Sequence, residues 1–336
     1  MISPNTLLSG KEIIELKQSS DWKNYLAIFN IWFQIALGFL IYALWSNIFT
    51  LLISLLIIGT RQFALVILMH DGAHNLISKN KKINDFISQW LCAYPMMTET
   101  NTYRTYHLKH HKHTETNLDP DKNLTIPFPV SKTSLARKIF RDLSGIAGLR
   151  RYAGYFTSAW GNSSGSFFSH LNHFFSKLYG FFICHIIIFS TLFFLNLPWL
   201  YLLLWWLPKL TIFSLFYRLR NIAEHACTSG EDDFSHTRTT LSPKLIRYFI
   251  APLNVNYHLE HHLFMFCPWY NLPKAHMMLR KKDFYKELEI GTAKPSNLEL
   301  NAVKHHFKNN LGVTGIGMYI SKTNLSINNL GDQNIT

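Results

Sequence analysis

The sequence predicts an all-α integral membrane protein whose four transmembrane helices form two hairpins. Three observations support this fold class. They are four apolar stretches long enough to cross a bilayer, an uneven distribution of Lys and Arg around them, and histidine motifs in the segments that follow them. A soluble chain of 336 residues would be expected to form about two domains of 100–200 residues each. The hydropathy of the chain overrides that expectation.

The first hairpin is expected over residues 27–45 and 48–69. Residues 27–45 carry no charged side chain, and a helix of this length, rising about 1.5 Å per residue, just spans a hydrocarbon core. Residues 48–69 contain a single charge, at Arg61. Since only two residues separate the stretches, the two helices must be antiparallel neighbours.

The second hairpin is expected over residues 179–196 and 197–217, which meet near Pro198. Lys209 is the only charge in this pair. A charge inside a membrane is costly. Because Lys209 and Arg61 each lie within about three turns of the ligand-bearing end of their helix, we expect both side chains to snorkel toward the cytoplasmic boundary.

The basic residues predict the orientation. Of the 33 Lys and Arg residues, three precede the first span, fourteen lie in residues 70–178 and fourteen in residues 218–336, and the turn inside each hairpin has none. By the positive-inside rule, both termini and the long central loop are cytoplasmic. All histidine motifs then lie on one side of the membrane. The N-terminus lacks an apolar core after a basic start, so we expect no cleavable signal.

We expect three regions along the chain: a cytoplasmic N-terminal segment over residues 1–26, a membrane domain over residues 27–290, and a polar tail over residues 291–336. The end of the tail is rich in Asn, Ser and Gly and is expected to be disordered. The net charge of +13 suits anionic lipid headgroups or would steer an acidic electron-carrier protein. Neither role requires nucleic acid as a partner.

Three histidine motifs have spacings that suit metal ligation. On a helix, residues three or four apart share a face, with Cβ atoms about 5–6 Å apart, so each motif can direct two imidazoles to one metal. Adjacent histidines diverge by about 100°, so H-x-x-H-H can serve two metals, and eight histidines exceed what one ion can use. The pattern therefore suggests a dinuclear centre. The motifs are H-x-x-x-H at His70 and His74, and H-x-x-H-H at His107, His110 and His111 and again at His258, His261 and His262.

A ninth histidine lies where the fourth apolar stretch ends. Asn221 and His225 have i, i+4 spacing, like His70 and His74 after the second stretch. A single histidine near a helix end is more often an ordinary polar residue. The symmetry with the His70 and His74 pair is what makes Asn221 and His225 candidates.

Three carboxylates, on Asp71, Glu224 and Glu260, each adjoin a proposed ligand. Each can orient an imidazole, or it can be a simple surface carboxylate, and the sequence leaves both alternatives open. Several further histidines lack paired spacing, and polar or interfacial roles are expected for them. They are His170, His173, His185, His236, His276, His305 and His306.

The identity of the metal follows from what is missing. Structural zinc usually takes cysteine ligands, and zinc proteases use H-E-x-x-H; neither pattern occurs here. Soluble di-iron proteins use E-x-x-H, which is also absent. Imidazole suits zinc, copper, iron and nickel alike. In a membrane setting with two neighbouring metals, iron that activates O2 against a lipid-like C–H bond fits best.

These residues resemble the membrane fatty-acid desaturase family, which includes hydroxylases and carotenoid ketolases. The match covers roughly residues 45–285. It includes H-D-x-x-H at His70, H-x-x-H-H at His107, N-I-A-E-H at Asn221 and N-Y-H-L-E-H-H-L at Asn256. The resemblance implies a four-helix membrane domain under a cytoplasmic helical cap that carries the histidine boxes. It also implies two iron ions held by nine histidines, with Asn221 contacting one iron through water.

The chemistry that the resemblance implies is O2- and electron-dependent abstraction of hydrogen from an unactivated C–H bond. A second abstraction gives a double bond, whereas oxygen rebound gives an alcohol, and the boxes do not choose between these outcomes. The sequence has no His-Pro-Gly-Gly haem motif, and its third box opens with His258 in place of Gln. Both features argue against a front-end desaturase fused to cytochrome b5. Electrons are therefore expected from a separate ferredoxin, rubredoxin, or cytochrome b5 with its reductase.

The sequence as a whole predicts a fatty acyl desaturase in the membrane. The nearest alternatives are a carotenoid ketolase or hydroxylase, or a fatty acyl hydroxylase, with the same boxes. A different class of protein, a divalent-metal transporter or sensor, would place ionisable ligands at mid-membrane. The predicted spans contain only Arg61 and Lys209, which repel cations.

Overall fold

The computed structural model describes residues 3–161, 165–228, 233–234, 236–282 and 285. Within these ranges the regular structure is helical, and one isolated antiparallel bridge pairs Thr239 with Tyr257. The all-α prediction is therefore confirmed for the described part of the chain. The polar tail expected over residues 291–336 lies outside the described residues.

The chain forms two compact units. The first, which we call the bundle unit, comprises Ser19–Thr105 and Ile139–Tyr217. The second, the histidine unit, comprises the described residues of Met1–Gln18, Tyr106–Lys138 and Arg218–Thr336. A boundary between units falls inside three helices, each of which contributes to both: α6 (Thr100–His113), α8 (Lys132–Leu143) and α12 (Ile212–His225).

Among the described residues, four helical segments are long and apolar enough to cross a membrane. They are α3 (Asp21–Leu44), α4 (Ile48–Ala73), α10 (Phe167–Phe194) and the segment Tyr201–His225. The last segment is composite, because η3 (Tyr201–Trp206) and α11 (Leu207–Leu210) precede α12. The spans expected over residues 27–45, 48–69, 179–196 and 197–217 overlap these four segments in order.

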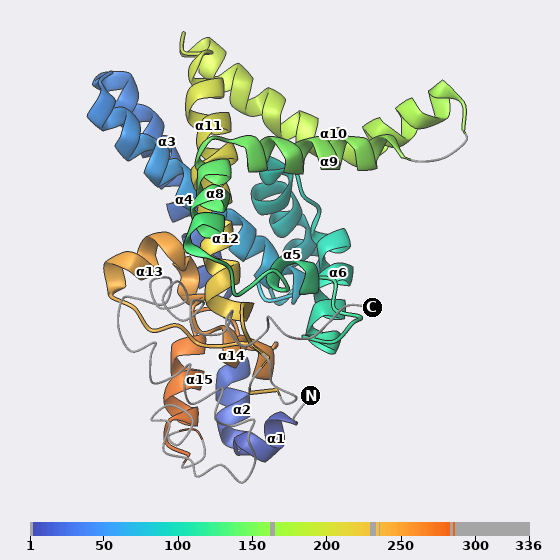
Figure 1. Cartoon of the computed structure of the whole chain (residues 1–336), viewed down its shortest axis with the longest axis vertical. Coiled ribbons are helices and arrows are strands. Elements are labelled where there is room, and N and C mark those ends of the chain that lie inside the picture. Colours follow the sequence, from blue (N-terminus) through green and yellow to red (C-terminus); the bar gives the residue numbers. More distant parts are fainter. Residues whose placement is uncertain (1–2, 162–164, 229–232, 235, 283–284, 286–336) are drawn as a thin grey trace. The chain divides into compact units, whose positions relative to one another are not determined.

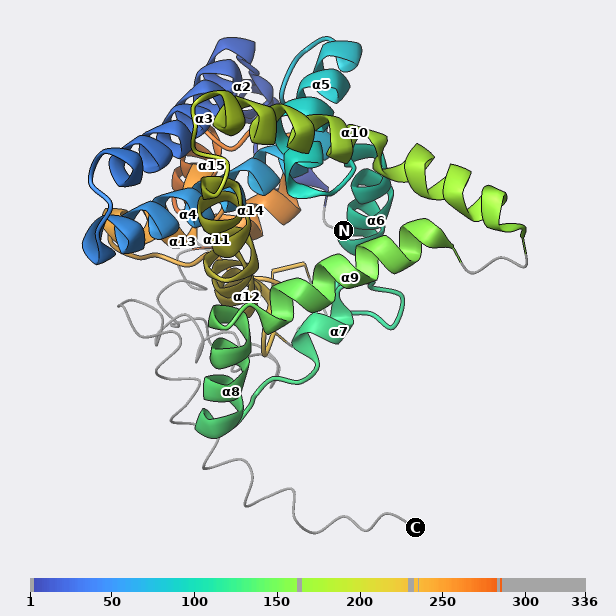
Figure 2. The same ribbon diagram turned by 90° about the horizontal axis from the view of Figure 1, so that it is seen from above.

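Helices α3 and α4 lie side by side as an antiparallel pair (Figure 1 and Figure 2). Asn47 begins α4, because its side chain accepts hydrogen bonds from the backbone N–H groups of Phe49 and Thr50 at 3.0 and 3.1 Å. Farther along, Ser54 Oγ donates to the carbonyl of Gly38 at 2.7 Å and joins the two helices. The opposite face of α3 exposes a stripe of large apolar side chains, which suits contact with lipid. The stripe comprises Trp22, Leu26, Phe29, Phe33, Leu37, Leu40 and Leu44.

The other two segments differ in detail from the expected spans. Helix α10 begins at Phe167, twelve residues earlier than expected, and Ser166 caps its first turn by accepting from the N–H of Ser169. In the fourth segment Pro208 has no N–H to donate, and the preceding turn, η3, is a π-helix. Gly59 lets α4 approach this segment closely, since a Cβ there would lie 2.5 Å from the Cβ of Ile212.

Lys209 does not snorkel, so that interpretation is wrong. Its side chain is 0% exposed, and Nζ donates to the carbonyl of Pro95 at 3.0 Å. The ammonium also lies 4.4 Å from the ring of Trp206 and 5.0 Å from that of Tyr152. The bundle unit thus supplies an acceptor, in η2 (Tyr94–Met96), and aromatic faces that stabilise a buried cation.

The remaining bundle elements follow α4 and precede α10. They are α5 (Lys81–Ile87), η1 (Ser88–Ala93), η2 and α9 (Ile146–Trp160). Helix η1 packs on the last turn of α4, and a Cβ at Gly72 would lie only 2.1 Å from Ser88 Oγ. This close approach fixes the end of α4, where His70 and His74 are located.

The histidine unit is assembled from sequence-distant pieces (Figure 1). Its short elements are α1 (Pro4–Leu7), α2 (Gly10–Lys17), α7 (Lys122–Thr125), α13 (Lys244–Ile250), η4 (Pro252–Asn254), α14 (His258–Leu263) and α15 (Leu272–Leu279). Apolar side chains of α1 and α2, including Ile13 and Leu16, share one core with Leu259 of α14 and Leu279 of α15. Asn271 reinforces this packing by donating to the carbonyl of Leu16 at 3.1 Å.

Candidate metal centre

Helix α6 carries the first H-x-x-H-H motif on its buried face. His107, His110 and His111 are 4%, 2% and 4% exposed, while Lys109 and Lys112 between and beside them face solvent. Helix α14 carries the second motif, with His258 and His261 buried and His262 half-buried. Both predictions of helical spacing for these motifs are confirmed, since each lies within a continuous helix.

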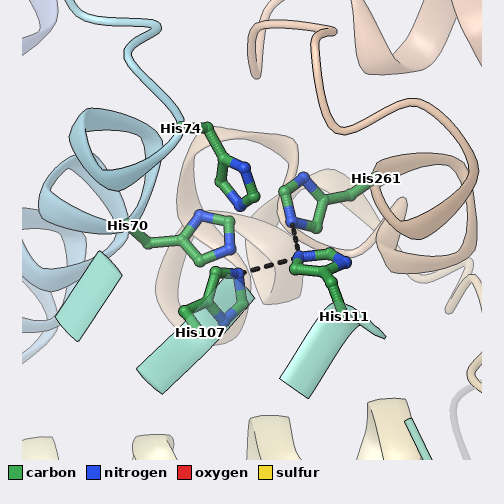
Figure 3. Close-up of side chains that lie close together, drawn as sticks. All are labelled: His70, His74, His107, His111 and His261. Atoms are coloured by element: carbon green, nitrogen blue, oxygen red, sulfur yellow. Dashed lines mark hydrogen bonds between the residues drawn. The ribbon is translucent and has the colours of Figure 1, made fainter. Parts of the chain in front are cut away.

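The first cluster joins the two motifs. Nε2 of His111 lies 2.9 Å from Nε2 of His107 and 3.0 Å from Nε2 of His261, as the dashed lines in Figure 3 show. One imidazole nitrogen offers either one proton or one lone pair. His111 Nε2 cannot therefore make a full hydrogen bond to both neighbours. A cation that receives a lone pair from all three nitrogens would satisfy the arrangement.

The second cluster consists of His110, His225, His258 and His262, of which His225 comes from α12. Nε2 of His258 lies 2.9 Å from Nε2 of His225 and 3.2 Å from Nε2 of His262, so the same conflict of donors and acceptors arises. The ligand atoms of His110, His225 and His262 lie within 4.8 Å of one another. His111 belongs to the first cluster and His110 to the second, so the first H-x-x-H-H motif contributes a histidine to each.

In the bundle unit, His70 and His74 form a pair at the end of α4 (both labelled in Figure 3), with ring centroids 5.1 Å apart. Arg104 holds this helix end. Its Nε donates to the carbonyl of Ala73 at 2.8 Å, and Nη2 donates to that of Gly72 at 3.0 Å. Burial and the nearby charge of Arg104 lower the pKa of His74 to about 4. His74 is therefore neutral at physiological pH, which is the state that binds metal.

A buried carboxylate sets the tautomer of His110. The Nδ1 of His110 donates to Oδ1 of Asp119 at 2.8 Å, which leaves the Nε2 lone pair available to the second cluster. Burial would raise the pKa of Asp119, but its hydrogen bond and charge interaction with His110 outweigh burial and lower that pKa. Sequence reasoning did not select Asp119, because it lies nine residues after His110, in a loop.

The three carboxylates beside the motifs are all buried. Asp71, Glu224 and Glu260 are 5%, 2% and 0% exposed, so the alternative of simple surface carboxylates is wrong for each. Asp71 lies near its neighbour, with Oδ1 3.3 Å from Nδ1 of His70. Glu224 lies in the second cluster, where its carboxylate oxygen is within 4.8 Å of the ligand nitrogens of His225 and His258.

Glu260 is the centre of a hydrogen-bond network that holds α14. Its Oε1 accepts from Nδ1 of His276 at 2.7 Å and from the hydroxyl of Tyr285 at 2.5 Å, and its Oε2 accepts from the hydroxyl of Thr239. His276 therefore has a specific positioning role that sequence reasoning missed. The position of His276 in the sequence gave no signal, because His276 lies on α15 and its partner Glu260 lies on α14.

The donor set suits a transition metal. Each cluster presents imidazole nitrogens, and burial and the neighbouring histidines lower the pKa of His262 well below its usual range. Neutral imidazole is a ligand for iron, zinc, copper and nickel. Asn221 lies one turn before His225 on α12 and is half-buried.

Comparison with known proteins places this site in a family. The model of the fatty acid desaturase family matches residues 45–290, which include every histidine of the clusters. The chain belongs to the fatty acid desaturase family. It is therefore a desaturase-family oxidoreductase, with histidine clusters compatible with metal binding.

The individual relatives share less than 30% sequence identity with this chain. The chain is 28% identical to dihydrorhizobitoxine desaturase of Bradyrhizobium elkanii over 66% of its length. It is 24% identical to beta-carotene 4-ketolase of Protosiphon botryoides over 76% of its length, and 24% identical to zeaxanthin 4-ketolase of Chlamydomonas reinhardtii over 70%. The matched parts cover 66%, 58% and 46% of these relatives, respectively.

Proposed function

We propose that the protein is an O2-dependent membrane di-iron oxidoreductase that introduces a C=C bond into a lipid acyl chain. The observation that carries the proposal is the pair of imidazole clusters, in which Nε2 atoms approach one another to 2.9–3.2 Å. Family membership and four membrane-length helices support a lipid-like substrate. The proposed ligands are His70, His74, His107, His110, His111, His225, His258, His261 and His262, with Asn221 acting through water.

The protein residues prepare this site for two ions. Bound iron, supplied with O2 and electrons, would provide the oxidising power to remove hydrogen from an unactivated C–H bond. Burial lowers the pKa of His74 and of His262, so that their lone pairs are available to a metal. Asp119 holds the proton of His110 on Nδ1, and Arg104 holds the end of α4 on which His70 and His74 are placed.

We further propose that both termini and the metal centre are cytoplasmic. The basic residues on either side of the apolar segments support this orientation. The electrons then come from a separate soluble or membrane-anchored donor, of the ferredoxin, rubredoxin or cytochrome b5 type. The positive net charge supports an acidic carrier.

Acyl-chain profiling tests the proposal. The protein is expressed in a heterologous host together with a donor system, and total fatty acids are analysed by mass spectrometry. New monounsaturated or polyunsaturated chains are expected with the native protein and are lost with His261→Ala. The matched control is His170→Ala, because His170 lies outside the clusters, where its Nδ1 hydrogen-bonds the carbonyl of Trp160 and its ring stacks on the Trp160 ring.

A carotenoid ketolase is the second candidate, because two of the relatives are 4-ketolases. The same host, supplied with carotenoids, separates the two. If the host accumulates carotenoids with oxygenated rings and its acyl profile does not change, the ketolase replaces the desaturase as the proposed function. In the acyl-chain assay, full conversion by His261→Ala would remove His261 from the ligand set.

A further inference from the structure

We propose that Glu224 is a direct carboxylate ligand of the metal ion in the second cluster, alongside His225 and His258. This inference rests on the proposed metal centre and adds to it a ligand outside the nine histidines. The carboxylate oxygen of Glu224 and the ligand nitrogens of His225 and His258 lie within 4.8 Å of one another. Atoms that bind one ion at about 2.0–2.2 Å lie roughly 3–4.4 Å apart, so the three can share an ion after small adjustments.

The orientation of the carboxylate supports the proposal. Oε1 accepts a hydrogen bond from Nε of Arg220 at 2.7 Å, one turn earlier on α12. Oε2 lies on the side of the imidazoles, 3.4 Å from Nε2 of His258. Arg220 thus occupies one oxygen and leaves the other directed at the cluster.

The bonding state of Oε2 is the second observation. Glu224 is 2% exposed, and Oε2 is buried without a hydrogen bond from any described residue. A buried carboxylate oxygen that has lost its water needs a donor or a cation in compensation. The groups facing it are imidazoles whose nitrogens already approach one another to 2.9 and 3.2 Å. A metal ion between them would satisfy Oε2 and the imidazole lone pairs together.

The two ions would then differ. The first cluster, formed within the histidine unit by His107, His111 and His261, offers imidazole nitrogens alone. The second would add one anionic oxygen ligand. A carboxylate is a harder ligand than imidazole, so the ion beside Glu224 is expected to favour the ferric state more than its neighbour does.

The competing explanation is that Glu224 only forms an ion pair with Arg220. Two variants separate these roles. Glu224→Gln removes the anionic ligand and keeps the shape of the side chain, whereas Arg220→Gln removes the ion pair and keeps the carboxylate. A ligand role predicts loss of metal affinity in the first variant alone, while an ion-pair role predicts equal effects in both.

The experiment titrates the purified, metal-stripped full chain with cobalt(II) and follows visible absorption and bound metal. The native chain is expected to bind two ions. Glu224→Gln should bind one of them about 10–100-fold more weakly, and Arg220→Gln should retain both within about threefold. Mössbauer spectra of the iron-loaded protein should show one of two signals altered by Glu224→Gln and the other altered by His111→Ala.

The outcomes are distinguishable. If the native chain binds no metal, the proposed function fails. If it binds two ions and Glu224→Gln leaves affinity and spectra unchanged, or if both variants weaken binding equally, the inference about Glu224 is wrong while the metal centre stands. Should Glu224→Gln not fold, Glu224→Asp takes its place with the same prediction, because the shorter side chain withdraws the carboxylate from the ion.

Discussion

His110 donates its Nδ1 proton to the carboxylate of Asp119 across 2.8 Å, and both side chains are buried. This link connects a loop that follows α6 to an imidazole of the second cluster. The partners of metal-binding imidazoles commonly contribute a 10–100-fold share of metal affinity, so the pair is a direct point at which to test the proposed centre.

The first prediction concerns this pair. Asp119→Asn should weaken binding of one metal ion by about 10–100-fold, because an amide orients His110 less strongly than an anion. Metal titration of the purified protein measures the effect. Asp121→Asn is the matched control, since Asp121 Oδ2 lies 3.7 Å from the same nitrogen, beyond hydrogen-bond distance. Equal losses in both variants would contradict the prediction.

The second prediction concerns the end of α4. Arg104→Lys should destabilise the protein by about 1.5–3 kcal/mol, because Lys keeps the charge but cannot reproduce the forked contacts to Gly72 and Ala73. Thermal unfolding in detergent measures this. Arg150→Lys, on the exposed surface of α9, should change stability by no more than about 0.5 kcal/mol. An unchanged unfolding temperature for Arg104→Lys would show that α4 is held by other contacts.

The third prediction is a pH dependence. Burial would raise the pKa of Asp85, but hydrogen bonds from Arg104 and Asn84 outweigh burial and bring it below the usual 3.8. A lowered pKa in the folded state means that the contribution of Asp85 is complete above the unfolded value and is lost as the pH falls through the folded value. The difference in unfolding temperature between native protein and Asp85→Asn should therefore be constant at about pH 5–7 and shrink below about pH 4. A difference that grows on acidification would contradict this sign.

The fourth prediction concerns the buried cation. Lys209→Ala should cost about 2–4 kcal/mol, because it leaves a cavity among aromatic rings and removes a donor from the Pro95 carbonyl. Thermal unfolding again provides the measurement. Leu202→Ala is the control in the same segment, since Leu202 is 68% exposed. Equal stabilities for both variants would mean that the contacts of the Lys209 side chain do not stabilise the fold.

What could be predicted from the sequence was the part encoded by local periodicity. The i, i+3 and i+4 spacings predicted that His107 and His111 would meet on one face of a helix, and they do. Apolar length predicted four membrane-length segments, because the hydrocarbon thickness sets the number of residues required.

The remainder depends on contacts between distant segments. His276 binds Glu260 from another helix, sixteen residues away, and no periodicity signals such a pair. Lys209 was expected at a boundary because an isolated charge in lipid is costly. The acceptor at Pro95, 114 residues earlier, offsets that cost and is invisible to a local pattern.

The packing of α2 on α15 has a consequence for biosynthesis. Asn271 bonds to the carbonyl of Leu16, 255 residues upstream. At a translation rate of about 5–20 residues per second, roughly 13–50 s pass before Asn271 is made. During that interval Ile13 and Leu16 have not yet met their partners on α14 and α15. The nascent chain must therefore keep this amphipathic segment shielded, by a chaperone or by the bilayer surface, until the last histidine box leaves the ribosome.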